Sequence, residues 1–529
     1  KQKTAYEIGV RLVGSEMCIR DRPTSRKGGI GRRRDLIRWM SWWEKNDKEM
    51  EMTSKQESTP EWLAEELREV CLGDKRLNWR LVDTGVKLAA KPSVSINQAC
   101  EEWADTKASY RLFANEKTTA EKILAPHYKR MGERAVGQGR VFAIQDTSYL
   151  DYSHHSQKEG MGPIGTGQQK LTGMVMHSAL LMSEAGLPLG LASQEIWVRP
   201  EATKQTDAEE RHRLPIEEKE SNKWLKALGQ TVERVPADVQ LVSIGDSEAD
   251  IFELFNHARN LKTDLLVRAA QDRSVCEPET GLLWSTLEKQ AVAGYLTVLV
   301  PPRNQEAKRE ATVKVRFAQI LLKAPAHLRK KMTNIPLYAV LVQEENPPTA
   351  VDSPLQWLLL TTVSVLSVDD AIERIRWYRL RWQIEVYHKI LKSGCQVEKT
   401  QLATVDRLLP FLALFSIIAW RIFWLTLIAR HQPDAPCTVV LTDHEWHSLF
   451  AFHHKSNRIP AQTPTVAQVV LWIAQLGGFL ARNHDGQPGV TVIWRGWQRL
   501  SDISSSWLIF HPTIPVSYTH LTLPTNREV

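Results

Sequence analysis

Hydrophobic residues near the start of the chain recur every three or four positions. This spacing places them on one face of an amphipathic helix. A first helix is indicated by Trp62, Leu63, Leu67 and Val70, and a second by Leu77, Leu81, Val86 and Leu88. Because a polar stretch precedes them from about residue 53, we predict a helical domain over residues 53–138.

The pattern changes near Arg140 to short apolar runs that are typical of buried β-strands. Strand-like runs at 140–145, 171–182 and 187–198 precede a helical segment at 217–228 and a strand ending at Asp246. This β-β-β-α-β order predicts an α/β domain over residues 139–430. Between about 260 and 354 we expect a β-rich insertion, because turn-rich segments separate further runs at 264–269, 295–300, 312–321 and 337–343.

Residues 408–429 are almost entirely apolar and about as long as a bilayer span. Arg421 near the middle and Pro410 near the start would be costly in lipid, so we interpret this segment as a buried helix and expect no membrane partner. A linker at 431–437 then leads to helical segments near 442–451 and 464–476. We therefore predict a helical domain over residues 431–503.

Composition narrows the class of protein only slightly. The 529 residues include 68 basic and 61 acidic ones, a net charge of +7, so any affinity for DNA must come from local basic clusters. Six scattered cysteines without a CxxC motif favour a reducing cytoplasm. Both ends resemble translated adapter sequence, so we expect residues 1–52 to be a non-native or disordered leader and 504–529 a non-native tail.

The candidate chemistry consists of three acids and their neighbours. Asp146 and Asp246 each end a strand-like run, and Glu385 lies in the segment 377–395, where Tyr378, Arg381, Glu385 and Lys392 fall on one stripe of an ideal helix. Each aspartate is also typical of a turn or helix cap, and charged residues at helical spacing are typical of a solvated face. These alternatives stay open for each residue taken singly.

Taken together, Asp146, Asp246 and Glu385 form an all-oxygen ligand set suited to Mg²⁺, with Mn²⁺ as a substitute. Two ions per active site would activate a water or a 3′-hydroxyl and stabilise the leaving oxygen of an in-line phosphoryl displacement. The sequence has no HExxH motif that would indicate another metal chemistry.

These residues resemble a known family. The order Asp146, Asp246, Glu385, joined to the spacing Tyr-x2-Arg-x3-Glu-x6-Lys, is similar to the bacterial IS-four family of DDE transposases and, within it, the transposon-five branch. The likeness extends from about residue 60 to about residue 501 and includes LGDKR at 72–76, YRLF at 110–113, WLLLT at 357–361 and LGGF at 476–479. It implies a ribonuclease-H-like catalytic core with a β-rich insertion, flanked by an N-terminal helical DNA-binding domain and a C-terminal helical domain that joins two subunits.

The resemblance also implies roles for individual residues. The three acids would be catalytic and hold the metal ions, and a further set would bind phosphate or hairpin DNA: Tyr378, Arg381, Lys392, Arg268, Trp357, Trp382 and Lys389. Trp357 would stack a flipped base, although a tryptophan at a strand start is also typical of a core residue. In the N-terminal domain the candidates for DNA contact are Arg76, Arg80, Lys107 and Arg111, with an ordinary charged helix surface as the alternative.

The function that this resemblance implies is cut-and-paste transposition. A homodimer would bind the terminal inverted repeats in double-stranded DNA, cleave both strands through a DNA hairpin and join the 3′ ends to target DNA. A catalytically silent DNA-binding relative or inhibitor of transposition is the alternative, and a nuclease that cuts without joining is a weaker one. The intact acids favour the enzyme.

Overall fold

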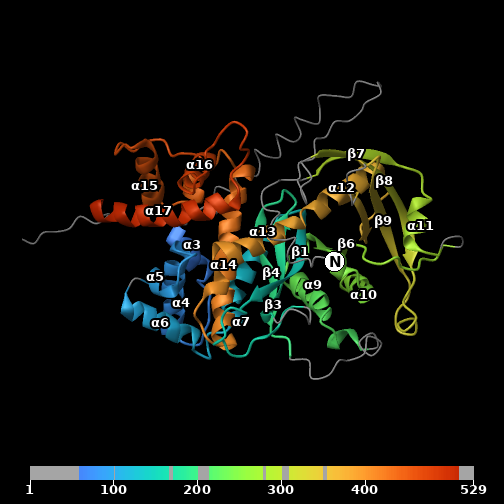
Figure 1. The fold of residues 1–529 in the computed structure, drawn as a ribbon, viewed down its shortest axis with the longest axis horizontal. Coiled ribbons are helices and arrows are strands. Elements are labelled where there is room, and N and C mark those ends of the chain that lie inside the picture. Colours follow the sequence, from blue (N-terminus) through green and yellow to red (C-terminus); the bar gives the residue numbers. More distant parts are fainter. Residues whose placement is uncertain are drawn as a thin grey trace, which may run out of the picture.

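The computed structural model describes residues 59–511, except residue 101 and the segments 166–170, 201–213, 278–280, 301–308 and 349–353. The leader predicted at 1–52 and most of the tail predicted at 504–529 lie outside the described residues. N-terminal helices, a central sheet with its own helices, and C-terminal helices follow one another along the chain (Figure 1). This arrangement agrees with the expected α/β fold flanked by helical domains.

The described N-terminal region consists of helices that bury the apolar positions predicted from their spacing. Leu63, Leu67, Leu81 and Leu88 are all completely buried. Asp74 begins the second helix as its N-cap, because its side chain accepts a hydrogen bond from the Arg76 backbone amide at 2.8 Å. The helices are α3 (Thr59–Glu66), α4 (Lys75–Ala90), α5 (Ile96–Cys100), α6 (Trp103–Phe113) and α7 (Ala120–Ala135).

A ten-stranded sheet forms the centre of the molecule. Its order is β2-β3-β1-β5-β6-β10-β9-β8-β7, with β4 beside β3. β1 is antiparallel to β3 and parallel to β5, which is in turn parallel to β6. The strands are β1 (Arg140–Asp151), β2 (Gly162–Pro163), β3 (Thr172–Ser183), β4 (Pro188–Trp197), β5 (Gln240–Gly245), β6 (Asp264–Arg268), β7 (Gly294–Val300), β8 (Arg309–Leu322), β9 (Ile335–Glu344) and β10 (Gln356–Thr361).

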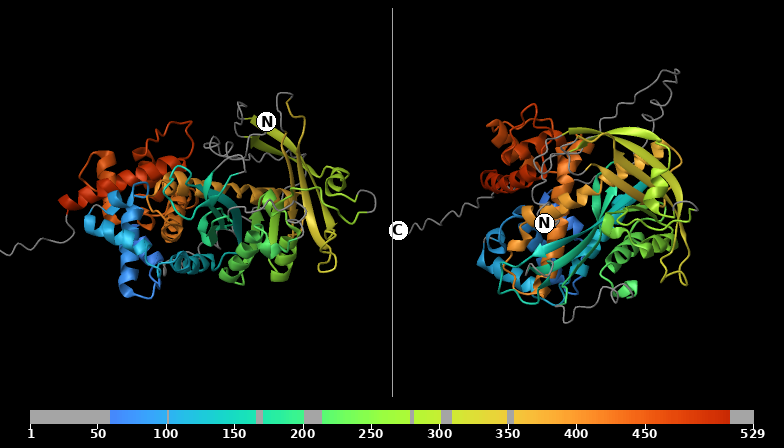
Figure 2. Two further views of the ribbon diagram at one scale, coloured as in Figure 1. Left: turned by 60° about the horizontal axis from the view of Figure 1, so that its bottom comes forward. Right: turned by 45° about the vertical axis from the view of Figure 1, so that its right-hand side comes forward.

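Two strands differ from the sequence-based expectation. β1 continues to Asp151, so Asp146 lies inside the strand and not at its end, because the residues after it remain paired with β3. The run at 264–269, which we had placed in the insertion, is β6 and pairs in parallel with β5. The insertion strands β7, β8 and β9 extend the same sheet away from the helical domains (Figure 2).

Helices between the strands pack against this sheet. The predicted helix at 217–228 is a 3-10 turn, η1 (Ile216–Glu218), followed by α9 (Asn222–Arg234), so the helix begins and ends later than expected. A short turn, η2 (Ser247–Ala249), follows β5 and leads to α10 (Phe252–Leu261), and α11 (Leu283–Glu288) precedes β7. Completely buried Leu228 and Phe255 pack α9 and α10 into one hydrophobic cluster with β6.

The segment 377–395 is not the single regular helix that we predicted. α12 (Val368–Arg379) ends before α13 (Trp382–Lys389), and between them the Leu380 and Arg381 amides bond to carbonyls three residues back. A π-helical turn, η3 (Ile390–Gly394), then follows. Gly394 suits this turn, because a Cβ there would lie 3.0 Å from the Trp494 ring. The ideal angular spacing therefore does not extend from Tyr378 to Lys392.

α14 (Val405–His431) is the one described helix that is long and apolar enough to cross a membrane. Protein surrounds 89% of its most apolar window, and the Arg421 guanidinium lies 5.3 Å from the Trp62 ring and 4.2 Å from the Trp424 ring. This burial favours the interpretation of α14 as a core helix.

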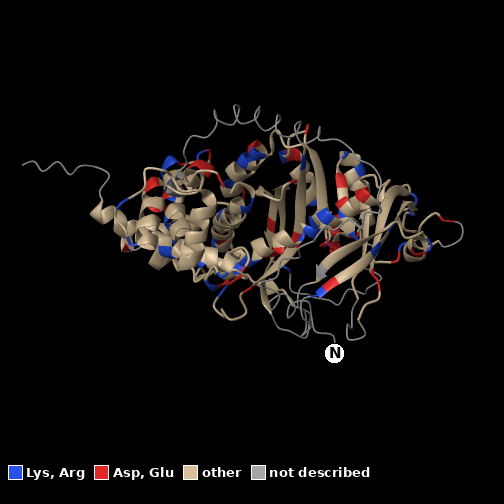
Figure 3. Cartoon of the chain, turned by 90° about the horizontal axis from the view of Figure 1, so that it is seen from above, with Lys and Arg blue, Asp and Glu red and all other residues tan. Residues whose placement is uncertain are grey.

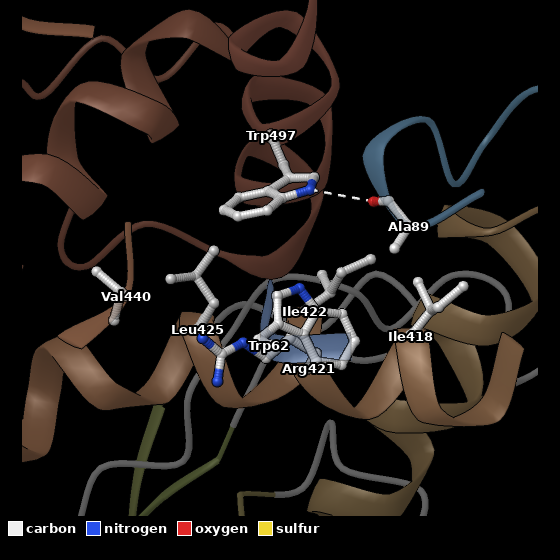
Figure 4. Close-up of a pocket in the computed structure, with 8 residues that line it drawn as sticks. All are labelled: Trp62, Ala89, Ile418, Arg421, Ile422, Leu425, Val440 and Trp497. Carbon is white, nitrogen blue, oxygen red and sulfur yellow. Dashed lines mark hydrogen bonds between the residues drawn. The ribbon is translucent and has the colours of Figure 1, made fainter. Parts of the chain in front are cut away.

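The C-terminal region contains α15 (Asp443–His454), α16 (Val466–Leu476) and α17 (Val490–Phe510). We did not predict α17, which extends beyond the expected domain end at residue 503. Trp497 of α17 donates to the Ala89 carbonyl at 3.3 Å, beside a small cavity where α3, α4, α14 and α17 meet (Figure 4). The two helical regions are therefore in direct contact.

Candidate active site

Asp146 and Asp246 lie on adjacent parallel strands and face the same side of the sheet. The parallel register pairs Ile144 with Ile244, so the residues two positions further along, Asp146 and Asp246, are level with each other. Asp246 follows β5 with extended backbone angles and so continues the strand direction. Because side chains alternate, both aspartates share the face of Ile144 and Ile244, and adjacent strands are only about 4.8 Å apart.

Glu385 reaches this face from α13. Ile384 and Tyr387, its neighbours on the helix, are completely buried in the same hydrophobic cluster as Ile144 and Ile244, which fixes α13 above the strands. The carboxylates of Asp146 and Asp246 both act electrostatically on Glu385. The fold thus brings the three predicted acids into one region, although 100 and 139 residues separate them along the chain.

The pKa values of the three acids shift in different directions. Burial raises the pKa of Asp246, and the charge of Asp146 raises it further. Burial also raises the pKa of Glu385, helped by both aspartates and opposed by Arg381. For Asp146 burial acts in the same direction, but His388, whose imidazole lies beside this carboxylate, and the charge of Arg381 bring its pKa below the usual value. A bound cation would therefore reduce the electrostatic repulsion among these carboxylates.

His388 is a neighbour that we did not single out from the sequence. Its Nδ1 lies 3.6 Å from Asp146 Oδ2, and the residue is only 5% exposed. Its buried Nε2 is among the described side-chain atoms without a hydrogen-bond partner. The available signal was its position three residues after Glu385, which places both on one face of α13.

The three acids do not form a ready-made metal cluster. In the part of the chain that the structure describes, no group of three or more His, Cys, Asp or Glu side chains is arranged to hold a metal ion. Arg381 donates to Glu385 Oε1 and so occupies one oxygen of that carboxylate. Asp246 Oδ1 accepts from the Glu248 amide at 2.9 Å, so it also caps η2, the alternative role that its sequence context indicated.

Tyr378 and Arg268 lie near the acids, whereas Lys392 is bound elsewhere. Burial raises the pKa of Tyr378, and Arg381, Arg268, Asp246 and Glu385 all contribute smaller electrostatic effects to it. Lys392 Nζ instead donates to the Tyr149 carbonyl at 2.7 Å and lies 3.4 Å from Glu398 Oε1.

The remaining predicted hairpin contacts differ in exposure. Trp382, at the start of α13, is 43% exposed. Trp357 is half-buried in β10 and packs against the main core, as its alternative interpretation required. Lys389 is also half-buried, with Nζ 5.8 Å from the centre of the Trp494 ring, and burial lowers its pKa.

The four cations predicted to contact DNA in the N-terminal domain differ in exposure and in pairing within the protein. Arg76, Lys107 and Arg111 are exposed, whereas the Arg80 guanidinium lies 3.7 Å from Asp105 Oδ1. Basic and acidic residues are intermixed over the visible elements (Figure 3). This distribution agrees with the modest net charge and leaves DNA affinity to local clusters.

Two parts of the chain match known protein families. Residues 59–118, which include α3 to α6, match the Transposase DNA-binding family. Residues 417–506, which begin within α14 and include most of α17, match the Transposase Tn5 dimerisation domain. These matches support DNA binding and a homodimer, and neither range includes the three acids. Together the two matches point to a Tn5-like transposase of the IS4 family.

Proposed function

We propose that this transposase is catalytically active and that Asp146, Asp246 and Glu385 are its catalytic residues. The observation that carries the proposal is the parallel register, which sets the two aspartates level on one face of the sheet beneath the helix that bears Glu385. The raised pKa values of Asp246 and Glu385 support it, because carboxylates with perturbed pKa values are characteristic of functional sites.

A ribonuclease-H-like core is part of this proposal. Three antiparallel strands, β1, β3 and β4, precede α9 and the parallel strand β5, and a late helix carries the glutamate. This is the β-β-β-α-β order expected from the sequence. The parallel pairing of β6 with β5 adds a further strand beside the acids.

Donor chemistry supports Mg²⁺ as the cofactor, with Mn²⁺ as a substitute and two ions per site. Asp146, Asp246 and Glu385 would hold the ions through oxygen atoms. A bound divalent cation would also offset the electrostatic repulsion among these carboxylates. When bound, the ions would supply activation of the attacking oxygen and stabilisation of the leaving oxygen. His388 would keep Asp146 ionised and oriented in both states.

Arg381 connects DNA binding to the availability of Glu385. In the free chain its guanidinium is bound to that carboxylate. A DNA phosphate is an alternative partner of matching geometry for the guanidinium, so binding of DNA would release Glu385 toward the aspartates. Tyr378 and Arg268, near the same acids, would then contact the DNA close to the cut.

Cleavage through a DNA hairpin, followed by joining of 3′ ends to target DNA, completes the proposed cut-and-paste reaction. In this proposal a homodimer assembled on two inverted repeats acts in the bacterial cytoplasm without a membrane partner. The exposed Trp382 on α13, and Trp357 and Lys389, remain candidates for the hairpin contacts. Lys392 is bonded to the Tyr149 carbonyl of β1 in the free chain. In this proposal a DNA phosphate would replace that carbonyl as the partner of the Lys392 ammonium.

The test is cleavage of labelled duplexes taken from either flank of the reading frame, with Mg²⁺, by the intact chain and by Asp146→Ala. We expect nicked and hairpin products from the intact chain and none from the variant. Glu253→Gln, which alters a carboxylate in the first turn of α10, is the control and should cleave normally. Equal cleavage by Asp146→Ala would overturn the proposed catalytic residues.

A catalytically silent DNA-binding relative is the second candidate. The ion pair between Arg381 and Glu385, together with the lack of a preassembled cluster among the described residues, favours it. The cleavage assay separates the two, because a silent relative would bind the same duplexes and leave them intact at every Mg²⁺ concentration.

A further inference from the structure

Two tryptophans of the N-terminal helices expose most of their surface. Trp79 of α4 is 62% exposed and Trp103 of α6 is 75% exposed. Tryptophan is highly buried on average, and an exposed indole costs hydrophobic free energy in the unbound protein. Both residues lie within the range that matches the Transposase DNA-binding family. The ligand of this region is therefore a candidate to cover the two indoles.

Exposed cations accompany each indole. On α6, Trp103, Lys107 and Arg111 recur at intervals of four residues and are all exposed, so they form one stripe. On α4, exposed Arg76 lies three residues before Trp79, and the Arg80 guanidinium lies 5.2 Å from the Trp79 ring. The charge of these stripes is therefore suited to an anionic partner.

Direct contacts hold α4 and α6 together. Lys87 Nζ donates to Asp105 Oδ2 at 2.6 Å, and the hydroxyls of Thr84 and Ser109 are 3.1 Å apart. The two helices lie at the end of the molecule opposite β7, β8 and β9 (Figures 1 and 2). The two stripes are thus carried by one packed helix pair, which lies far from the sheet extension.

Asp105 determines which cations remain available. It is paired with Lys87 and lies 3.7 Å from Arg80, so these two charges are partly neutralised within the protein. No described ion pair engages Arg76, Lys107 or Arg111. An anion with apolar surface between its charges fits this arrangement, and duplex DNA presents deoxyribose and base edges between its phosphates.

We propose that Trp79 and Trp103 supply the apolar contacts of the DNA-binding face, against sugar and base edges between phosphates held by Arg76, Lys107 and Arg111. This proposal rests on the proposed function for its ligand, double-stranded DNA, and adds two residues to the predicted contacts. In this proposal the two indoles contribute a non-electrostatic part of the DNA affinity, and the cations contribute the electrostatic part.

The test measures binding of the full chain, without metal, to fluorescein-labelled duplexes taken from both flanks of the reading frame, at several salt concentrations. Trp79→Ala and Trp103→Ala should each weaken binding about tenfold with an unchanged salt dependence. Lys107→Ala and Arg111→Ala should reduce the slope of log affinity against log salt by about 0.9 each. Tyr295→Ala, which removes a 57% exposed aromatic ring from β7, is the matched control and should bind as the intact chain does.

The other outcomes distinguish failure of the proposed function from failure of the inference about the two tryptophans. If the intact chain binds neither duplex, the proposed function fails. If it binds and both tryptophan variants bind equally well, or if they change only the oligomeric state, the indoles do not contact DNA and the inference is overturned. Trp79→Phe and Trp103→Phe, with melting temperatures of all variants, guard against loss of folding, since the phenyl ring should restore part of the affinity.

Discussion

Two carboxylate sites in this molecule, one buried and one half-buried, contain similar residues and differ in how well their charges are balanced. Glu66 of α3 accepts two hydrogen bonds from Arg134, both at 2.9 Å, and lies 2.5 Å from His127 Nδ1. In the candidate active site, three carboxylates share one guanidinium, Arg381, and one imidazole, His388.

The pKa values reflect this difference. Burial alone would raise the pKa of Glu66, yet Arg134 and His127 lower it to about 2. At the other site the pKa values of Asp246 and Glu385 are raised, first by burial and then by neighbouring carboxylates. The Glu66 network holds α3 to α7, and its charges are balanced within the protein. At the candidate active site the negative charge exceeds the positive charge, so this site can attract cations.

The largest expected effect is on catalysis. Asp246→Asn keeps the shape of the side chain and should reduce cleavage about 10³-fold or more, because it removes a metal-binding oxygen charge. The same change should leave the free energy of unfolding unchanged or higher, since it relieves repulsion with Asp146. Cleavage assays and denaturant unfolding measure the two effects. A variant that loses both cleavage and stability would contradict the contrast between the sites.

The reverse pattern is expected for Glu66→Gln. Loss of this charge leaves Arg134 and His127 without their partner and should lower the free energy of unfolding by about 3 kcal/mol, as a pKa lowered from 4.5 to about 2 implies. Cleavage per folded molecule should persist. Glu69→Gln, which breaks the exposed pair with Lys129, is the control and should unfold like the intact chain. Equal unfolding of both variants would show that the buried network contributes nothing.

A smaller effect is expected at His388. His388→Leu removes the group beside Asp146 and should reduce cleavage about 10- to 100-fold while raising the Mg²⁺ concentration needed for half-maximal rate. His388→Asn, whose amide can replace Nδ1 as a donor, should recover most of the loss. If Asn and Leu behave alike, the contact with Asp146 does not position that carboxylate.

The pH dependence of stability should have opposite signs at the two sites. Because the pKa of Glu66 is lower in the folded state, its stabilisation is present above about pH 4.5 and is lost as pH falls toward 2. Because the pKa of Asp246 is raised, its unfavourable effect is absent below its unfolded pKa and develops as pH rises through the folded pKa. The unfolding free energy of Asp246→Asn relative to the intact chain, measured from pH 3 to pH 7, should therefore increase with pH.

Sequence patterns predicted the strands that carry the two aspartates better than the geometry of the helix that carries Glu385. The apolar runs that form β1 and β5 were recognised in the sequence, and the pairing of these strands sets Asp146 and Asp246 level with each other. The break between α12 and α13, the π-helical turn and the bond from Lys392 to Tyr149 depend on long-range packing such as that of Trp494 on Gly394. No local spacing encodes these contacts, so the regular helix that we assumed was wrong.

Placement of β6 shows the same limit. Its apolar run was recognised, but an isolated strand pattern does not specify its partner, and only the parallel register with β5 assigns it to the core. Likewise, α17 begins after a turn-rich segment, and its apolar face against α15 and α16 becomes evident only in the folded domain.

The central claim is that Asp146, Asp246 and Glu385 share divalent cations. Mn²⁺ binding by electron paramagnetic resonance, in the presence of end duplex, tests it most directly on the intact chain, Asp146→Asn and Glu385→Gln. We predict two bound ions per chain for the intact protein and fewer for each variant. Identical Mn²⁺ binding by all three proteins would contradict the account.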